Sequence, residues 1–261
     1  MTQVKATVLR AAGINCDVET QHALELAGAQ VQRIHINQMI ENKHLLDDCH
    51  ILVFPGGFSY GDDVSAGRIL SNQIIHYLYE RLETFIRNGK LVLGICNGFQ
   101  VLVKTGLLPG TSASAKGITI TNNDSEKYED RWVYVAPQTD RCVFLDAGRQ
   151  LYLPVAHAEG KVVVRDPAVL QHLKDDRHIA FKYVDRDGQE GPYPVNPNGA
   201  TESIAGLTDA TGRILGLMPH PERNIHPTHH PHWTRQDDNV SCDGQCLFDN
   251  AVNYVKDTLL T

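Results

Sequence analysis

The segment Gly94-Ile95-Cys96-Asn97-Gly98 constrains the fold of this chain more than any other. It directly follows Leu91-Val92-Leu93, a short aliphatic run typical of a buried strand. Glycines two residues before and two residues after Cys96 permit a sharp strand-to-helix turn in which larger side chains would clash. This spacing is that of a nucleophile elbow with cysteine in the place of serine. It predicts a reactive thiol at the carboxyl edge of a sheet, where the dipole of the following helix favours the thiolate.

The order of strand and helix patterns predicts an α/β fold. In the first hundred residues they alternate, which implies a mostly parallel central sheet flanked by helices on both faces. In the second half strands follow one another with few helices between them, which indicates an added antiparallel region. We expect strands at 6–9, 31–36, 51–54, 91–95, 131–136, 150–155, 161–165 and 180–183 and a strand running from Ile214 into His220, with helices at 17–27, 67–88, 169–174 and 247–260.

A glycine pair ends the strand expected at 51–54, in Pro55-Gly56-Gly57. Glycines at the end of a strand let backbone N–H groups approach a ligand closely. The Gly57 N–H is thus a candidate for one half of an oxyanion hole, and the Asn97 N–H for the other half. An ordinary exit from a strand into a loop explains the glycine pair equally well.

The segment Met218-Pro219-His220-Pro221-Glu222 contains a candidate general base, His220, and a carboxylate to orient its ring, Glu222. Its two prolines stiffen the loop and fix the spacing of the two side chains. A nucleophile, a base and an orienting group can come from distant segments and meet in the fold. Cys16 is a rival nucleophile, but it lacks the flanking glycines of an elbow.

These segments resemble those of the class I (triad) glutamine amidotransferases. Within that class the chain resembles the family of glutaminase subunits of phosphoribosylformylglycinamidine synthase, in its longer variant. Ala12 and Ala158 depart from the family, which usually has proline and glycine there, and residues 224–261 resemble it least. The resemblance rests on blocks 13–17 (GINCD), 55–62 (PGGFSYGD), 94–100 (GICNGFQ), 153–160 (LPVAHAEG), 196–199 (NPNG) and 218–223 (MPHPER).

The resemblance implies a role for each residue of the site. Cys96, His220 and Glu222 would be the catalytic triad, and Gly57 and Asn97 the oxyanion hole. Gln100 lies about one helical turn after Cys96 and so would face the same cleft, although an exposed helix glutamine remains an alternative. His157 and Glu159 have the spacing of the triad pair, but the family motif places that pair at His220 and Glu222. The residues expected around the substrate are Gly56, Phe58, Gln100, His157 and Glu159.

The resemblance also implies the reaction and its partners. Glutamine would be hydrolysed through a cysteinyl thioester, and the ammonia would pass to a separate synthase subunit that makes formylglycinamidine ribonucleotide in purine biosynthesis. A small accessory subunit is expected as well. The sequence has no G-x-x-x-x-G-K-[ST] phosphate loop, so ATP and Mg²⁺ are expected in the synthase partner, with no cofactor and no metal in this subunit.

Composition excludes several other classes of protein. A net charge of −7 disfavours a nucleic-acid partner, and no apolar run is long enough to span a membrane. The first residues lack the apolar core of a signal peptide, and a thiol required in reduced form favours the cytoplasm. A length of 261 residues suits a single glutaminase domain, 1–261, with 224–261 as its extended C-terminal segment.

The histidine-rich C-terminal segment suggests a zinc site as an alternative. Pro227 and Pro231 break the histidine run into loop, and no such metal belongs to the family, so we favour a loop that contacts a partner or covers the site. The residues in question are His226, His229, His230, His232, Cys242 and Cys246.

Three alternative functions remain open at this point. The chain could be a glutaminase serving another synthase. It could be a protease- or deglycase-like hydrolase, but such proteins usually take their base from just after the elbow cysteine, and here that residue is Asn97. A non-catalytic regulator is disfavoured by the intact Cys96, His220 and Glu222.

Overall fold

A nine-stranded mixed sheet forms the centre of the computed structural model, which describes residues 3–110, 117–235 and 242–260. Residues 236–241 and 261 of the expected C-terminal segment lie outside these ranges. The strand order is β2-β1-β3-β4-β11-β10-β9-β6-β7. The parallel strands are β2 (Gln30–His35), β1 (Lys5–Arg10), β3 (Ile51–Phe54), β4 (Leu91–Ile95) and β11 (Ile214–Leu217). Antiparallel pairing continues through β10 (Ile204–Thr208), β9 (Ile179–Val184), β6 (Glu129–Pro137) and β7 (Leu151–His157).

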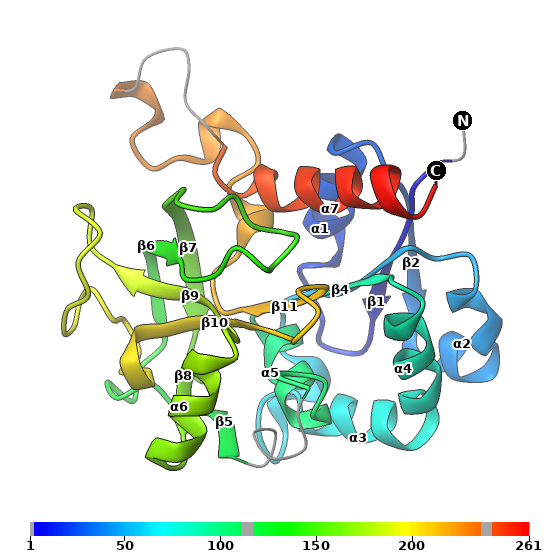
Figure 1. The fold of residues 1–261 in the computed structure, drawn as a ribbon, viewed down its shortest axis with the longest axis horizontal. Coiled ribbons are helices and arrows are strands. Elements are labelled where there is room, and N and C mark those ends of the chain that lie inside the picture. The colour runs from blue at the N-terminus through cyan, green and yellow to red at the C-terminus, as the bar shows by residue number, and fades with distance from the viewer. Residues whose placement is uncertain (1–2, 111–116, 236–241, 261) are drawn as a thin grey trace.

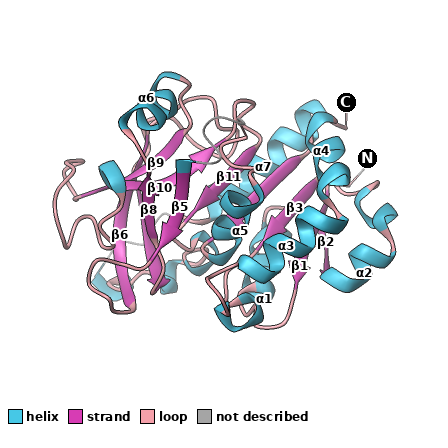
Figure 2. Cartoon of the chain, turned by 90° about the horizontal axis from the view of Figure 1, so that it is seen from below, coloured by secondary structure: helices cyan, strands magenta, loops and turns pink. Residues whose placement is uncertain are grey.

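Helices cover both faces of the parallel half of the sheet (Figure 1). Helices α1 (Asp17–Leu26) and α7 (Gln245–Thr258) lie on one face, where the Gln245 side chain donates to the Ala23 carbonyl at 3.1 Å. Helices α3 (Arg68–Tyr77) and α5 (Asn97–Thr105) lie on the other face. The remaining helices are α2 (Ile36–Glu41), α4 (Tyr79–Arg87) and α6 (Pro167–Asp175), and β5 (Ile118–Thr121) pairs with β8 (Lys161–Val164) in a separate sheet (Figure 2). Among the described helices none has the length and apolar character needed to cross a bilayer.

The predicted α/β class with an added antiparallel region is confirmed, and several elements need correction. The helix expected at 67–88 is two helices, α3 and α4, because Leu78 leaves the helical region (φ −125°, ψ −7°). Its N–H still bonds to the Ile74 carbonyl and its carbonyl still accepts from Leu82, so the apolar periodicity passes through the break unchanged. Strands β5 and β10 and helix α2 were not expected; in β10 the residues Ala205 and Gly206 have low strand propensity.

The register of the central strands positions the site. Strands β3 and β4 are buried along their whole length, as expected for parallel strands covered on both faces. Phe54 is opposite Gly94, and Ile95 is opposite Leu217. Strands β3, β4 and β11 therefore end at the same edge, and the three segments that follow them emerge side by side.

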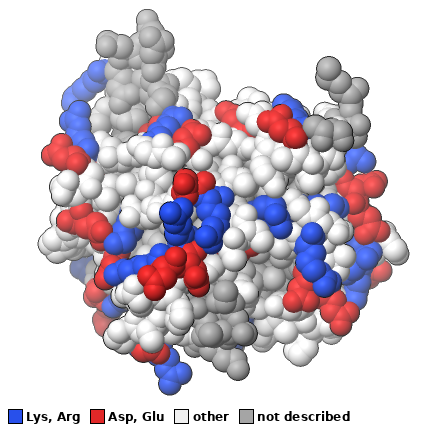
Figure 3. All heavy atoms as spheres, viewed as in Figure 1, with Lys and Arg blue, Asp and Glu red and all other residues white. Residues whose placement is uncertain are grey.

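Charged side chains of both signs are interspersed on the surface of the face drawn in Figure 3. Ion pairs among the described residues include Lys174 with Glu202 at 2.7 Å and Arg177 with Asp140 at 2.9 Å. Exposed pairs of this kind typically stabilise by less than about 1 kcal/mol each. The fold thus depends on its buried sheet and helices rather than on these contacts.

Replacing Gly98 by alanine tests the packing of α5 on β3. A Cβ at Gly98 would lie 1.9 Å from the Phe54 carbonyl oxygen, so α5 would have to move away from the sheet. We expect Gly98→Ala to destabilise the protein by about 3 kcal/mol or more. Gly191→Ala is the control, because its Cβ would meet Val195 at an ordinary 3.4 Å. Equal thermal unfolding midpoints for the two variants would show that α5 can accommodate a side chain at residue 98 without losing its packing on β3.

Candidate active site

The predicted sharp turn is present at Cys96, between β4 and α5. Cys96 has φ 49° and ψ −103°, a conformation that non-glycine residues rarely adopt. Its N–H donates to the Leu217 carbonyl at 2.8 Å, and its carbonyl accepts from the Gln100 N–H at 3.1 Å. A Cβ at Gly94 would lie 2.8 Å from the Gly98 carbonyl oxygen, so the turn needs its flanking glycines. The surrounding backbone thus holds a strained cysteine, a feature that concentrates at functional sites.

His220 and Glu222 form a buried pair beside this turn. The Nδ1 of His220 lies 2.6 Å from Oε1 of Glu222, and the His220 N–H donates to the Pro154 carbonyl of β7 at 2.8 Å. The Nε2 of His220 is buried and has no hydrogen-bond partner in the described part of the chain. The carboxylate therefore fixes the ring through Nδ1 and leaves Nε2 available for proton transfer.

The charge state of His220 follows from its neighbours. Burial disfavours a charged imidazole, but the carboxylate of Glu222 and the sulfur of Cys96 outweigh this and hold the pKa of His220 well above its usual value. Cys96 is thus close enough to interact electrostatically with the ring. These neighbours therefore favour the imidazolium, a form that can donate a proton.

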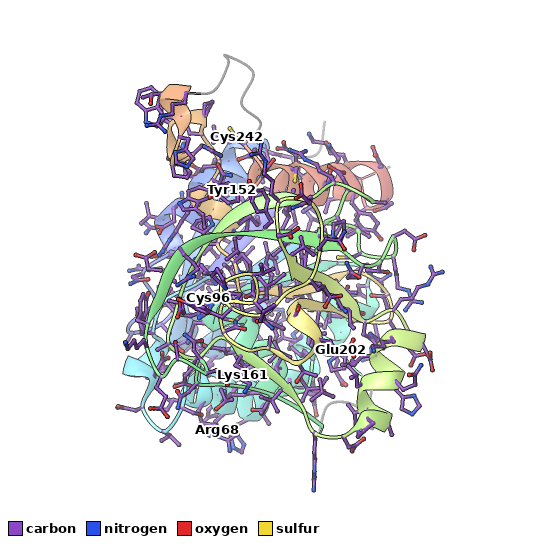
Figure 4. All side chains as sticks on the ribbon, turned by 90° about the vertical axis from the view of Figure 1, so that its left-hand side faces the viewer. Arg68, Cys96, Tyr152, Lys161, Glu202 and Cys242 are labelled. Atoms are coloured by element: carbon purple, nitrogen blue, oxygen red, sulfur yellow. The ribbon has the colours of Figure 1, made fainter. Side chains whose placement is uncertain are left out.

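Two partly exposed aromatic rings lie beside each other, and one of them lies near Cys96. Cys96 is only 5 % exposed and lies within the body of the molecule (Figure 4). Phe58 and Tyr128 are 40 % and 50 % exposed, with ring centroids 6.4 Å apart. Burial raises the pKa of the Tyr128 phenol, and Cys96 adds to the rise, so this ring lies close to Cys96. No sequence pattern singled out Tyr128, because only the fold brings its loop close to Cys96.

The glycine turn after β3 packs directly against His220. A Cβ at Gly56 would lie 2.7 Å from Cε1 of His220, and one at Gly57, which has φ +141°, would lie 2.8 Å from the Asn15 nitrogen. The Gly56 carbonyl accepts from the Cys16 N–H at 3.2 Å. Packing therefore requires glycine at both positions. The hydrogen bond from Cys16 brings residues 13–17 beside the His220–Glu222 pair.

Cys16 lies on the Glu222 side of the imidazole. Its sulfur is 4.0 Å from Nδ1 of His220 and accepts from the Arg223 guanidinium at 3.1 Å. Burial raises the pKa of the Cys16 thiol. In the described ranges, Cys16, His220 and Glu222 are the one group of three potential metal ligands within 4.8 Å of one another. However, Nδ1 is already bonded to Glu222, and the Arg223 cation opposes a second positive charge.

Gln100 reaches the site, but its amide is used within the protein. Its Oε1 accepts from Nδ2 of Asn97 at 3.0 Å, and its Nε2 donates to the Glu159 carbonyl. The Glu159 carboxylate accepts from the Ala66 N–H at 3.2 Å. Both residues thus join segments around the site, and direct contact of either one with glutamine stays a prediction.

His157 is buried near His220 but differs from it in charge. Its Nδ1 lies 3.1 Å from Oδ1 of Asn123, and its Nε2 has no partner within the described residues. Burial, together with repulsion from His220, lowers the pKa of His157 to about 3. His157 is therefore neutral at physiological pH.

The histidines of the C-terminal segment contact aromatic rings or neighbouring side chains. The ring of His230 lies 5.9 Å from that of Trp132 and 5.4 Å from that of Tyr152, and Nδ1 of His226 lies 2.9 Å from the Thr228 hydroxyl. Over the part of this segment that the structure describes, they do not gather with Cys242 or Cys246 into a metal cluster. The zinc alternative has no support from this arrangement.

Comparison with known proteins identifies the family. The model of the CobB/CobQ-like glutamine amidotransferase domain matches residues 3–255. Phosphoribosylformylglycinamidine synthase subunit PurQ of Dehalococcoides mccartyi is 44 % identical over 98 % of this chain and 99 % of that protein. The chain belongs to the PurQ family of glutamine amidotransferases. The PurQ subunit of Methanococcus maripaludis strain S2 is 40 % identical over 96 % of this chain and 97 % of its own length.

A solved structure agrees with this assignment. A chain of the PurLQS structure from Thermotoga maritima is 29 % identical, covers 97 % of this chain and 100 % of its own length, and superposes with a TM-score of 0.74. The expected resemblance is thereby confirmed, and the chain is an enzyme with a glutamine amidotransferase domain. A non-catalytic regulator and a protease-like hydrolase are disfavoured.

The two buried histidines should titrate differently. The measurement is NMR of ¹⁵N-histidine-labelled protein near neutral pH. We expect the ring nitrogens of His157 to show a neutral imidazole and those of His220 to show a protonated imidazole. Unfolded His157 gains its proton near pH 6.5, whereas folded His157 gains it only at a pH of about 3. The free energy of unfolding therefore decreases as the pH falls through that window.

His157→Gln provides the assignment and the control. It should remove the His157 signals and make the unfolding midpoint fall less steeply on acidification, because the variant has no buried imidazole to charge. A His157 that titrates near its ordinary pKa would contradict the burial argument.

Proposed function

We propose that this chain hydrolyses glutamine to glutamate and ammonia through a thioester on Cys96 and delivers the ammonia to a synthase subunit that makes formylglycinamidine ribonucleotide. The observation that carries the proposal is the buried His220–Glu222 pair, with Nε2 of the ring unpartnered in the described residues beside the elbow cysteine. This arrangement is that of a nucleophile, a base and an orienting carboxylate.

The steps follow from the position of each group. The sulfur of Cys96, having given its proton to His220, attacks the carboxamide carbon of glutamine. The N–H groups of Gly57 and Asn97 stabilise the oxyanion, and removing one such donor typically costs ~10²–10³ in rate. His220 then protonates the leaving nitrogen through Nε2 and ammonia departs. Finally His220 takes a proton from water, which attacks the thioester and releases glutamate.

The substrate would enter between the aromatic rings near the thiol. Phe58 and Tyr128 lie beside each other and are partly exposed, and Gly56 gives the base room because it has no side chain. His157, held neutral, adds no second positive charge beside His220. Gln100 and Glu159 join the elbow helix to the loop after β7 and so shape the pocket.

We further propose the setting in which the chain works. PurQ relatives are named as synthase subunits, and the structural neighbour comes from a PurLQS structure, which supports a synthase partner and a small accessory subunit. ATP and Mg²⁺ would belong to the synthase partner, with no cofactor in this subunit. The whole chain would act as one glutaminase domain in the cytoplasm, without nucleic acid or membrane as partner.

Replacing Cys96 by alanine tests the nucleophile. In the complex with its synthase, Cys96→Ala should abolish glutamine-dependent synthesis but leave ammonia-dependent synthesis largely intact, because added ammonia bypasses this subunit. Cys246→Ala, which removes a thiol from α7, should change neither activity. Cys16→Ala should still form the thioester. If Cys16→Ala were inactive with glutamine and Cys96→Ala active, the nucleophile would be Cys16.

Glutaminase activity should depend on the synthase partner. Free ammonia in neutral water is mostly protonated and no longer nucleophilic, so its release must be coupled to its use by the synthase. We therefore expect the glutaminase site to be completed only when the synthase docks. Residues 223–235 directly follow Glu222, and Asn224 donates to the Tyr152 carbonyl of β7 at 2.9 Å, so this segment can transmit docking to the base. We expect deletion within 229–233 to weaken activation by the synthase more than it lowers the unfolding midpoint.

The measurement is glutaminase kcat/KM with and without the synthase. If the free subunit already works at full rate and the partner changes nothing, the chain is a stand-alone glutaminase and the docking proposal is wrong.

A further inference from the structure

The side chain of Asn97 joins two segments that the proposed mechanism needs in a fixed relation. It is buried, and its Oδ1 accepts from the Ser59 N–H at 3.2 Å. Its Nδ2 donates to Oδ1 of Asp62 at 3.0 Å and to Oε1 of Gln100 at 3.0 Å. The first two contacts are with the loop after β3 and the third lies within α5. One amide therefore links the glycine turn to the elbow helix.

The loop joined in this way adopts an unfavourable backbone. Tyr60, Asp62 and Val64 have φ of 56°, 54° and 73°, in the left-handed region that non-glycine residues avoid. Such residues cost on the order of 1–3 kcal/mol each and persist only where their surroundings hold them. The contacts of Asn97 with Ser59 and Asp62 are among those that hold this loop against α5.

We propose that the Asn97 side chain is a positioning residue that fixes the distance between the two oxyanion donors, and that Asp62 fixes the orientation of its amide. The inference rests on the proposed function, in which the N–H groups of Gly57 and Asn97 are those donors. One donor belongs to the glycine turn and the other to the helix, so a tie between these two segments sets their separation.

Asp62 is suited to the second role because a carboxylate only accepts hydrogen bonds. An asparagine amide can present its oxygen or its nitrogen to a neighbour, and the two are similar in shape. With Asp62 ionised, Nδ2 must face the carboxylate, and Oδ1 then faces the Ser59 N–H. The opposite orientation would place two acceptors together and leave the buried N–H of Ser59 unpaired, at a cost of about 1–3 kcal/mol.

The carboxylate is placed where its charge is costly. Burial raises the pKa of Asp62 to about 6, and Glu159 adds to the rise, whereas hydrogen bonds from Gly67 and Asn97 and the charge of Lys104 oppose it. Asp62 is still ionised at neutral pH, so it serves as an acceptor under working conditions. A carboxyl group kept at such a position, bonded to the residue that follows Cys96, points to a functional role.

The test compares Asn97→Ala with Ser59→Ala in the complex with the synthase partner. Asn97→Ala keeps the backbone N–H of residue 97, so any loss arises from its position rather than from removal of a donor. We expect kcat/KM for glutamine to fall about 10²-fold, mostly through kcat, as for a misplacement of about 1 Å. Ser59→Ala keeps the N–H that Asn97 accepts and removes only a buried hydroxyl with no partner in the described residues, so it should match wild type.

A second readout separates oxyanion positioning from damage to the nucleophile. Alkylation of Cys96 by iodoacetamide needs the thiolate but no oxyanion hole. We expect Asn97→Ala to react with iodoacetamide at the wild-type rate, and Asp62→Asn to retain most of the kcat that Asp62→Ala loses, because its side-chain oxygen can still accept from Asn97.

Three results would overturn the proposal. Wild-type kcat/KM in Asn97→Ala would show that the side chain is not needed. Equal losses of the alkylation rate and of kcat/KM in Asn97→Ala would show that the Asn97 side chain supports the conformation of Cys96 rather than the oxyanion donors. Equal loss in Asp62→Asn and Asp62→Ala would remove the role of Asp62. Failure of the proposed function has a different signature, namely full glutaminase activity in Cys96→Ala.

Discussion

The common end point of β3, β4 and β11 is the constraint on which the site depends. Because these parallel strands stop at one edge in register, the glycine turn, the elbow and the His220 loop emerge together. The contact of Gly98 with the Phe54 carbonyl then holds the elbow helix against the neighbouring strand end. The reactive groups thus come from three distant parts of the chain, and a buried hydrogen-bonded sheet sets their spacing.

The site contains two buried histidines whose surroundings give them opposite charge states. Both rings lose hydration, which by itself favours the neutral form. His220 faces the carboxylate of Glu222 and is held protonated, whereas His157 faces the amide of Asn123 and stays neutral. The charged neighbours of each ring therefore decide its charge state: Glu222 and Cys96 favour the charged form of His220, and His220 disfavours that of His157.

The sequence predicted the α/β class, the elbow turn and the strand ends that carry the site, because glycine spacing and aliphatic runs act locally. It did not reveal the break at Leu78 or the strand β10, where periodicity and composition gave no signal. The pairs His157-x-Glu159 and His220-x-Glu222 have the same spacing, yet only Glu222 faces its histidine, and Glu159 bonds to the Ala66 N–H. The place of Tyr128 and the contact of Gln100 with the Glu159 carbonyl depend on long-range packing that no local pattern encodes.

The hydrogen bond from the His220 N–H to the Pro154 carbonyl has an evolutionary consequence. Cys96 and His220 both follow strands of the parallel half, β4 and β11, whereas this bond also anchors the backbone of His220 on β7 in the antiparallel half. Substitutions that shift the antiparallel half against the parallel half would change the distance between the Cys96 thiol and the His220 imidazole. Such substitutions in one half would therefore need compensating substitutions in the other. Recombination between distant homologues would then separate Cys96 from His220 at any junction between α5 and β11, and a junction after β7 would also separate Pro154 from His220.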